Sequence, residues 1–182
     1  MKTVLITGAA SGLGWALSQQ AFALGYRVIL ADMNEVLLEA RVEALAARDA
    51  ERVTSRVLDV TNSDAITLLV PWLEKHGGLD LLINNAGIMA CPLTRLDQGG
   101  GPGWEQQFGV NHLGHFALAQ ALMPLLEKTA ALPDSDVRVV ALSSTGHKIS
   151  DIRWDDPNWE TGEYDKWQAY GQAKTADALF AG

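Results

Sequence analysis

The chain has 182 residues, of which 48% are hydrophobic and 20% are charged, as is typical of a globular domain with a sizeable core. Its net charge of −8 argues against nucleic acid or an anionic membrane as the main partner, and its single cysteine, Cys91, excludes an internal disulfide. Because no apolar run is long enough to span a membrane, we expect one cytoplasmic domain over residues 1–182.

The N-terminal segment predicts a buried strand followed by a phosphate-binding turn. Val4–Ile6 is a short apolar run, as expected of a parallel strand buried on both faces. The pattern T-G-x-x-x-G-x-G follows it and opens a helix that runs to about Leu24. Such glycines let the backbone approach a pyrophosphate, to which the helix N-terminus offers N–H donors. The alternative is a turn needed only for tight packing. We predict that a dinucleotide contacts Gly8, Ser11, Gly12, Leu13 and Gly14.

The second strand ends at an acidic residue that bears on cofactor choice. Tyr26–Ala31 reads as this strand, and Asp32 follows it. A carboxylate there accepts hydrogen bonds from the adenosine ribose hydroxyls and repels a 2′-phosphate, which favours NAD over NADP. No arginine or lysine lies in the glycine turn or just after Asp32 to favour the phosphate. A compatible alternative is that Asp32 caps the helix that begins near Asn34.

The next two elements continue the alternation of helix and strand. Glu35 to about Ala50 is an amphipathic helix, and Arg52–Leu58 alternates apolar and polar residues as an outer strand would. Asp59 and Val60 follow that strand, where a carboxylate can meet the adenine amino group of a dinucleotide. Asp59 is equally well placed to cap the helix that comes next.

The following helix and strand lead to a second run of small residues. The helix covers roughly Asp64–Lys75 and contains Pro71, so a kink or an early end is expected. Leu79–Ile83 reads as the fourth strand, and the run Asn84-Asn-Ala-Gly follows it. Small residues there keep the backbone open beside a ligand. The alternative is a turn without a ligand. We predict that Asn85, Ala86 and Gly87 line the site of the nicotinamide ribose.

After a loop whose flexible part is Gln98–Gly103, Trp104 to about Lys128 reads as one long helix. Asn111 lies in its middle, where a buried amide costs stability unless it is paired. His112 and His115 are three residues apart, but no third ligand of suitable spacing accompanies them. We therefore predict no metal site.

Two serines follow the fifth predicted strand, Val137–Leu142. Hydroxyls at the C-terminal end of a parallel strand point into the crevice where ligands of doubly wound sheets bind. Of Ser143 and Ser144, one is expected only to cap a turn. Ile149–Trp167 then reads as a solvated loop with aromatic anchors.

The last helix, about Trp167–Phe180, carries Tyr170 and Lys174 four residues apart and therefore on one face. An ammonium near a phenol stabilises the phenolate, so the tyrosine can give or take a proton near neutral pH. The pattern Y-x-x-x-K alone is weak, and its value depends on a cofactor site being built upstream. Taken together, the elements predict an α/β fold, a doubly wound parallel sheet of the Rossmann type with strand order 3-2-1-4-5 and helices on both faces.

These motifs resemble, in order and in placement, those of the short-chain dehydrogenase/reductase family over essentially the whole chain. The stretch F-G-V-N-H-L-G-H-F, the insert D-D-P-N-W and the long separation of Ser144 from Tyr170 look like the branch with retinol-dehydrogenase-like and WW-domain-oxidoreductase-like enzymes. Many of those enzymes prefer NADP, whereas Asp32 favours NAD here. The matched positions are the glycine turn, Asp59-Val60, Asn84–Gly87, Asn111, Ser144, Tyr170 and Lys174.

The resemblance implies a role for each catalytic position. Tyr170 would be the general acid/base for the substrate oxygen, and Ser144 would donate a hydrogen bond to that oxygen. Tyr170 and Lys174 would also contact the cofactor, where Lys174 would bind the nicotinamide ribose and stabilise the phenolate. Asn111 would hold a water in a proton relay with Lys174. The implied reaction moves a hydride between NAD and a small-molecule alcohol, ketone or aldehyde, in a homodimer or homotetramer.

Family members usually continue beyond the catalytic helix with two more strands and most of the substrate pocket. This chain stops at Gly182, so we expect it to lack the usual C-terminal substrate-binding segment. The alternative to an enzyme is a non-catalytic dinucleotide-binding or interaction protein. A sugar-nucleotide epimerase of related fold is a weaker alternative because its glycine spacing differs.

Overall fold

The computed structural model of the protein describes residues 1–97 and 103–181, so the predicted flexible stretch Gln98–Gly103 lies, except for Gly103, outside the described residues. The chain divides into two compact units. The first, here called the sheet unit, is Met1–Ala86 with Ala117–Val140. The second, here called the Tyr170 unit, is Gly87–Phe116 with Ala141–Gly182. That residues 1–182 form a single domain stays a prediction.

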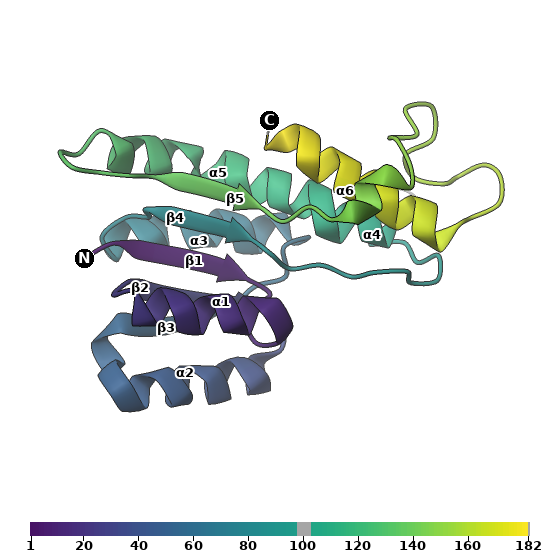
Figure 1. Cartoon of the computed structure of the whole chain (residues 1–182). Coiled ribbons are helices and arrows are strands. Elements are labelled where there is room, and N and C mark those ends of the chain that lie inside the picture. The colour runs from purple at the N-terminus through teal and green to yellow at the C-terminus, as the bar shows by residue number, and fades with distance from the viewer. Residues whose placement is uncertain (98–102, 182) are drawn as a thin grey trace. The chain divides into compact units, whose positions relative to one another are not determined.

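The sheet unit is built on a five-stranded sheet with strand order β3-β2-β1-β4-β5 (Figure 1), which confirms the predicted α/β fold. β1 is central and all five of its residues are buried, as expected of a strand covered on both faces. Leu5 pairs in parallel register with Ile29 of β2 and with Leu82 of β4. The strands are β1 Thr3–Thr7, β2 Arg27–Asp32, β3 Val53–Val57, β4 Leu81–Asn84 and β5 Arg138–Ala141.

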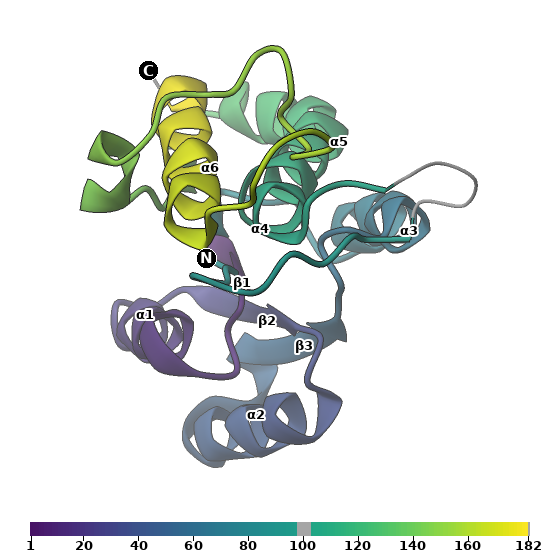
Figure 2. The same ribbon diagram turned by 90° about the vertical axis from the view of Figure 1, so that its right-hand side faces the viewer.

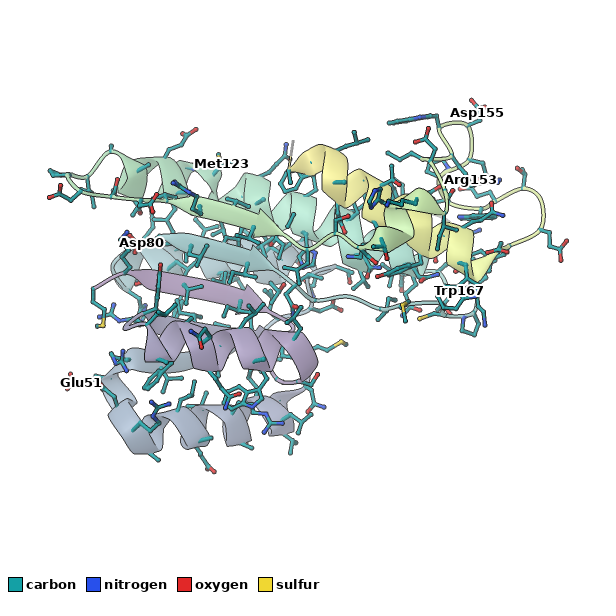
Figure 3. The ribbon with its side chains drawn as sticks, in the orientation of Figure 1. Glu51, Asp80, Met123, Arg153, Asp155 and Trp167 are labelled. Atoms are coloured by element: carbon teal, nitrogen blue, oxygen red, sulfur yellow. The ribbon has the colours of Figure 1, made fainter. Side chains whose placement is uncertain are left out.

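Asp80, which directly precedes β4, is hydrogen-bonded to the first residues of β1 and β5 (Figure 3). Its carboxylate Oδ2 accepts a hydrogen bond of 2.7 Å from the N–H of Thr3, where β1 begins. Its backbone carbonyl accepts one of 2.9 Å from the N–H of Arg138, where β5 begins. These bonds fix where the strands start and hence where their carboxyl ends, which bear the site residues, come to lie.

Helices cover both faces of the sheet. α1 (Gly12–Ala23) and α2 (Glu35–Asp49) lie on one face and α3 (Ser63–Lys75) on the other (Figures 1 and 2). The part of α5 (Gly114–Ala130) that belongs to this unit buries leucines at helical spacing. Burying such a side chain contributes about 1.5–3 kcal/mol. The fully or nearly fully buried side chains of these helices include Phe22, Leu38, Leu73, Leu118, Leu122 and Leu126.

Two helices end close to where the sequence predicted. α2 ends at Asp49 and continues as a 3₁₀ turn, η1 (Ala50–Arg52). α3 continues past Pro71 to Lys75, the predicted end, so the helix does not end early at the proline. Pro71 is exposed, and water can therefore bond the backbone carbonyl that the proline leaves without an N–H partner.

The Tyr170 unit is mainly helical. Its helix begins at α4 (Gln106–Phe108), passes through the π-helical turn η2 (Gly109–Leu113) and enters α5, whereas the sequence predicted a regular helix from Trp104. The carboxylate of Glu105 caps α4 by accepting the N–H bonds of residues 107 and 108, so the helix begins after it. The other elements are η3 (Thr145–Lys148) and α6 (Lys166–Phe180), and none of the described helices is long and apolar enough to cross a membrane.

Asp156 organises the insert before α6. Its carboxylate accepts hydrogen bonds from the N–H of Glu160 at 2.7 Å and from the N–H and hydroxyl of Thr161, and these bonds lower the pKa of Asp156 to about 2. Arg153 lies over the ring of Trp159, which is 4% exposed. Trp159 is thus one of the aromatic anchors that the sequence predicted for this insert, whereas Trp154 is 73% exposed.

Candidate active site

The glycine turn of the sheet unit needs its glycines for two different reasons. Gly8 has a φ of 65°, and a Cβ there would lie 2.8 Å from the Cα of Ala86, while a Cβ on Gly14 would overlap the carbonyl of Gly8. Packing therefore explains these two positions. Gly12 has a φ of 51°, and nothing lies within 4 Å of where its Cβ would stand. The turn is open at Gly12, as backbone that meets a ligand must be.

The N-terminus of α1 keeps its backbone donors available. Ser11 is the N-cap residue, but its side chain makes no capping hydrogen bond, and Leu13 is 58% exposed. The first N–H groups of a helix have no intrahelical acceptor, and the helix dipole adds positive potential there. An exposed glycine turn with these donors fits the pyrophosphate of a dinucleotide.

The side chains of Thr7, at the end of β1, and of Asn85, just after β4, join the glycine turn to the segment that follows β4. The hydroxyl of Thr7 accepts hydrogen bonds from the N–H groups of Asn85 and Ala86 at 2.9 and 3.0 Å. The amide of Asn85 donates to the carbonyls of Thr7 and Gly8 at 2.8 and 3.3 Å. The amide of Asn84 is buried and has no hydrogen-bond partner among the described residues. Asn85 and Ala86 thus lie directly beside the turn, whereas Gly87 is exposed and belongs to the Tyr170 unit.

Asp32 lies at the carboxyl end of β2, next to the same turn. Its Oδ2 accepts the N–H of Ala10 at 3.0 Å, and its Oδ1 accepts the N–H of Asn34 at 3.0 Å. The cap of α2 is Asn34, whose Oδ1 accepts the N–H of Leu37, so the alternative that Asp32 caps this helix is wrong. Each carboxylate oxygen keeps a further lone pair, which leaves Asp32 able to accept hydrogen bonds from a ribose.

Arg41 is a residue near the turn that the sequence did not point to. Its Nε donates to the carbonyl of Ala10 at 2.9 Å, and its guanidinium lies 4.9 Å from the ring centroid of Trp15. Among the described residues, its two terminal nitrogens have no acceptor. Ala10 therefore links Arg41, through its carbonyl, with Asp32, through its N–H. The part of the turn beside Asp32 therefore bears a cation as well as an anion.

Asp59 and Val60 follow β3 in the sheet unit. The Oδ1 of Asp59 accepts both the N–H and the hydroxyl of Thr61, at 2.9 and 2.7 Å, and its carboxylate is exposed. Asn62 is the residue that caps α3, so the alternative capping role of Asp59 is wrong. Val60 is 5% exposed. The adenine contact predicted for this pair stays a prediction.

In the Tyr170 unit, Gly146 brings Tyr170 and Ser144 together. A Cβ on Gly146 would lie 2.7 Å from the Cε1 of Tyr170 and 3.4 Å from the Oγ of Ser144. The Oγ of Ser144 accepts the N–H of Gly146 at 3.1 Å, while Ser143 donates to the carbonyl of Lys174 at 2.8 Å. Both serines thus have structural bonds. The hydroxyl hydrogens of Ser144 and Tyr170 have no acceptor within residues 1–97 and 103–181, so both are available to a ligand.

Lys174 follows Tyr170 by one turn of α6. Its Nζ lies 5.9 Å from the ring centroid of Tyr170 and donates to the carbonyl of Leu142 at 2.8 Å. It also pairs with Oδ2 of Asp177 at 2.9 Å, and both side chains are more than nine-tenths buried. An ammonium has three N–H donors, so one of them has no acceptor among the described residues.

Asn111 lies in the π-helical turn η2 and is 1% exposed. Its amide bonds the backbone of Ile88 twice, donating to the carbonyl and accepting from the N–H, each at 2.8 Å. These two bonds satisfy the buried amide that the sequence marked as needing a partner. The water relay predicted for Asn111 stays a prediction.

Two histidines flank the lysine, and neither is arranged as a metal ligand set. Nδ1 of His112 lies 3.2 Å from Oδ1 of Asp177, and Nδ1 of His115 lies 2.9 Å from the carbonyl of Asn111. Burial lowers the pKa of His115 to about 4, so its ring is neutral at neutral pH. No group of three or more metal-ligating side chains is present among the residues that the structure describes.

Most of the chain, including the glycine turn and Ser144, matches a known family. The family model described as short chain dehydrogenase matches residues 2–153. The chain belongs to the short-chain dehydrogenase family. This confirms the resemblance seen in the sequence. A short-chain dehydrogenase binds a nicotinamide cofactor, and the open turn at Gly12 and the acceptor at Asp32 fit that group.

Relatives and solved structures agree with this assignment. Human retinol dehydrogenase 13 is 36% identical over 181 residues, covering 98% of this chain and 52% of that protein. An uncharacterised protein from Mycobacterium paratuberculosis has a crystal structure with a TM-score of 0.82 and 37% identity, covering 99% of this chain and 60% of that one. A short-chain dehydrogenase/reductase from Burkholderia phymatum, solved in complex with NAD, has a TM-score of 0.74 and 28% identity, covering 98% of this chain and 57% of that one. The chain spans little more than half the length of these proteins.

Proposed function

We propose that the protein is an oxidoreductase that transfers a hydride between NAD and a small-molecule alcohol, ketone or aldehyde. The observation that carries this proposal is the convergence of Tyr170 and Ser144 on Gly146, with Lys174 one helical turn away. Each hydroxyl keeps its hydrogen available to a ligand. A packing role alone does not require two free hydroxyl donors beside one glycine.

The proposed chemistry divides between Tyr170 and Ser144. Tyr170 gives a proton to the carbonyl oxygen during reduction and takes one from the alcohol during oxidation. Ser144 already accepts the N–H of Gly146 at 3.1 Å, which orients its hydroxyl, and donates to the same substrate oxygen. The nicotinamide cofactor, when bound, supplies or accepts the hydride.

Lys174 has an electrostatic and a binding role in this proposal. Its ammonium lies 5.9 Å from the ring centroid of Tyr170, where it stabilises negative charge that develops on the Tyr170 oxygen during proton transfer. Its remaining N–H donor is available to the ribose hydroxyls of the cofactor. The side-chain oxygen and nitrogen of Asn111 are both bonded to the backbone of Ile88. A water in the proposed relay would therefore be bound by the backbone of Asn111 and not by its side chain.

We also propose that NAD is preferred over NADP. The support is Asp32, whose carboxylate lies at the end of β2 against the N–H of Ala10 and would repel a 2′-phosphate. Arg41, which is bonded to the carbonyl of Ala10, would attract a 2′-phosphate. Its charge therefore reduces the preference for NAD over NADP. We further propose that the protein works in the cytoplasm as a homodimer or homotetramer. A monomeric mass in a sedimentation experiment would contradict the proposed oligomer.

A fluorescence titration with NADH and then with NADPH, followed by a turnover assay on a panel of alcohols and carbonyl compounds, tests the proposal. We expect saturable binding that is tighter for NADH, and turnover of at least one substrate class. Binding without turnover of any compound would support the alternative of a non-catalytic dinucleotide-binding protein.

A further inference from the structure

Asp177 lies on the same face of α6 as the two catalytic positions. Tyr170, Lys174 and Asp177 are spaced i, i+4 and i+7, which places them along one side of a helix. Asp177 is 4% exposed, and a buried carboxylate is costly unless it is paired. Neither the glycine turn nor the proposed chemistry accounts for a buried acid at this position.

Both oxygens of this carboxylate are bonded. Oδ2 pairs with the ammonium of Lys174 at 2.9 Å, and Oδ1 lies 3.2 Å from Nδ1 of His112. His112 comes from η2 and is held between aromatic rings, with centroid distances of 5.4 Å to Phe108 and 6.1 Å to Phe116. Asp177 is therefore fixed from two directions and has a defined position relative to the ammonium.

Among the described residues, the titratable side chains on the elements packed against α6 are His112 of η2 and the exposed His147 and Lys148 of η3. His115 of α5 also interacts electrostatically with Asp177 and Lys174. Burial keeps His115 neutral at neutral pH, with a pKa of about 4. Exposed charges are screened by water and salt. The buried negative charge of Asp177 is therefore the charge that offsets the positive charge of Lys174 most strongly.

We propose that Asp177 is a positioning residue for Lys174, which holds the ammonium against the carbonyl of Leu142 and offsets part of the positive charge that acts on Tyr170. This inference rests on the proposed function, because it acts through the catalytic tyrosine. Its consequence is that Asp177 sets the pH range of the reaction. Removing the acid would leave the ammonium of Lys174 unopposed, which favours loss of the phenol proton in such a variant.

Asp177→Asn tests this directly, because asparagine has the same shape and lacks the charge. We expect the rising limb of kcat/KM for alcohol oxidation to move to lower pH by about 0.3 to 1 pH unit, for a unit charge about 10 Å away along the helix. Asp177→Glu, which keeps the charge, should retain the original limb. The matched control is Asp155→Asn, the same change of charge in the exposed insert (Figure 3).

A titration of phenolate absorbance provides a second measurement that needs no turnover. The chain has three tyrosines, and subtracting the titration of Tyr170→Phe isolates the signal of Tyr170. Burial raises the pKa of Tyr164 above its usual range, which moves its signal away. The phenolate of Tyr170 should appear at lower pH in Asp177→Asn than in the unaltered protein. If Asp177→Asn does not fold, as seen by circular dichroism, Asp177→Ser replaces it with the same expectation.

The outcomes separate this inference from the proposed function. If Tyr170→Phe is inactive but Asp177→Asn leaves both the pH limb and the phenolate titration unchanged, the role of Asp177 is wrong and the function stands. A shift of equal size in Asp155→Asn also overturns it. If the unaltered protein turns over no substrate, the proposed function fails, and the phenolate titration still decides whether Asp177 acts on Tyr170.

Discussion

In the sheet unit the site is fixed by backbone geometry, whereas in the Tyr170 unit it is fixed by buried polar side chains. Gly8 and Gly14 have no room for a Cβ, and the strand ends follow from parallel register. In the Tyr170 unit, Lys174, Asp177 and Asn111 are held by hydrogen bonds and an ion pair. The first kind of site is sensitive to added volume and the second to changed charge or lost hydrogen bonds.

The largest effect is expected for Tyr170→Phe in the Tyr170 unit. Removing the hydroxyl removes the proton donor, so turnover should fall by about 10²–10⁴-fold. Binding of NADH, followed by fluorescence, should change little, and steady-state kinetics measure the loss. Trp167→Phe in the same helix is the control, because its side chain is nearly half exposed and should leave turnover unchanged. A Tyr170→Phe variant with full activity would show that Tyr170 is not the acid/base.

The next effect concerns pH and the buried ring of His115. Burial lowers the folded-state pKa of His115 from 6.5 to about 4, so only the unfolded state binds a proton between these values. Stability from this residue is complete above pH 6.5 and falls as pH drops toward about 4, by about 3 kcal/mol. Urea unfolding at several pH values measures this. His115→Gln keeps an N–H donor for Asn111 and should lose that part of the pH dependence, so an unchanged pH slope would contradict the assignment.

A smaller effect is expected for added volume in the glycine turn. Gly8→Ala combines a positive φ with a Cβ 2.8 Å from the Cα of Ala86, and should destabilise the fold by about 1–3 kcal/mol. Gly162→Ala is the matched control, because Gly162 also has a positive φ but has nothing within 4 Å of its Cβ position. Urea unfolding compares the two. Equal losses would mean that backbone strain, and not the close approach to Ala86, makes Gly8 necessary.

The smallest effect concerns the preference for NADH over NADPH. Asp32→Ala removes the charge that repels a 2′-phosphate and should weaken the preference by about tenfold, which corresponds to about 1.4 kcal/mol. Arg41→Ala should act in the opposite direction and strengthen it, by less. Fluorescence titrations with both cofactors measure each ratio. If Arg41→Ala leaves the ratio unaltered, its guanidinium serves only to hold the carbonyl of Ala10.

The sequence predicted the fold and most of the sheet unit because its signals are local. A short apolar run and a glycine turn lie within a few residues of one another, as Val4 and Gly8 show, and Asp32 directly follows the apolar run of the second strand. The alternative that Asp32 caps α2 is wrong, since the residue that caps this helix is Asn34.

The parts that the sequence did not predict depend on contacts between distant segments. Arg41 reaches the turn only because α2 packs beside α1, and Asp177 acquires a role only because η2 brings His112 to it. The π-helical turn likewise has no sequence signal of its own and places Asn111 against the backbone of Ile88.

The transfer of a labelled hydride tests the central claim most directly. The protein would be incubated with NADH carrying deuterium at the reactive carbon of the nicotinamide, together with each compound of a ketone and aldehyde panel, and the products would be examined by mass spectrometry. We predict an alcohol with one deuterium on the former carbonyl carbon, and no such product from Tyr170→Phe. Saturable NADH binding with no labelled alcohol from any compound would contradict the account.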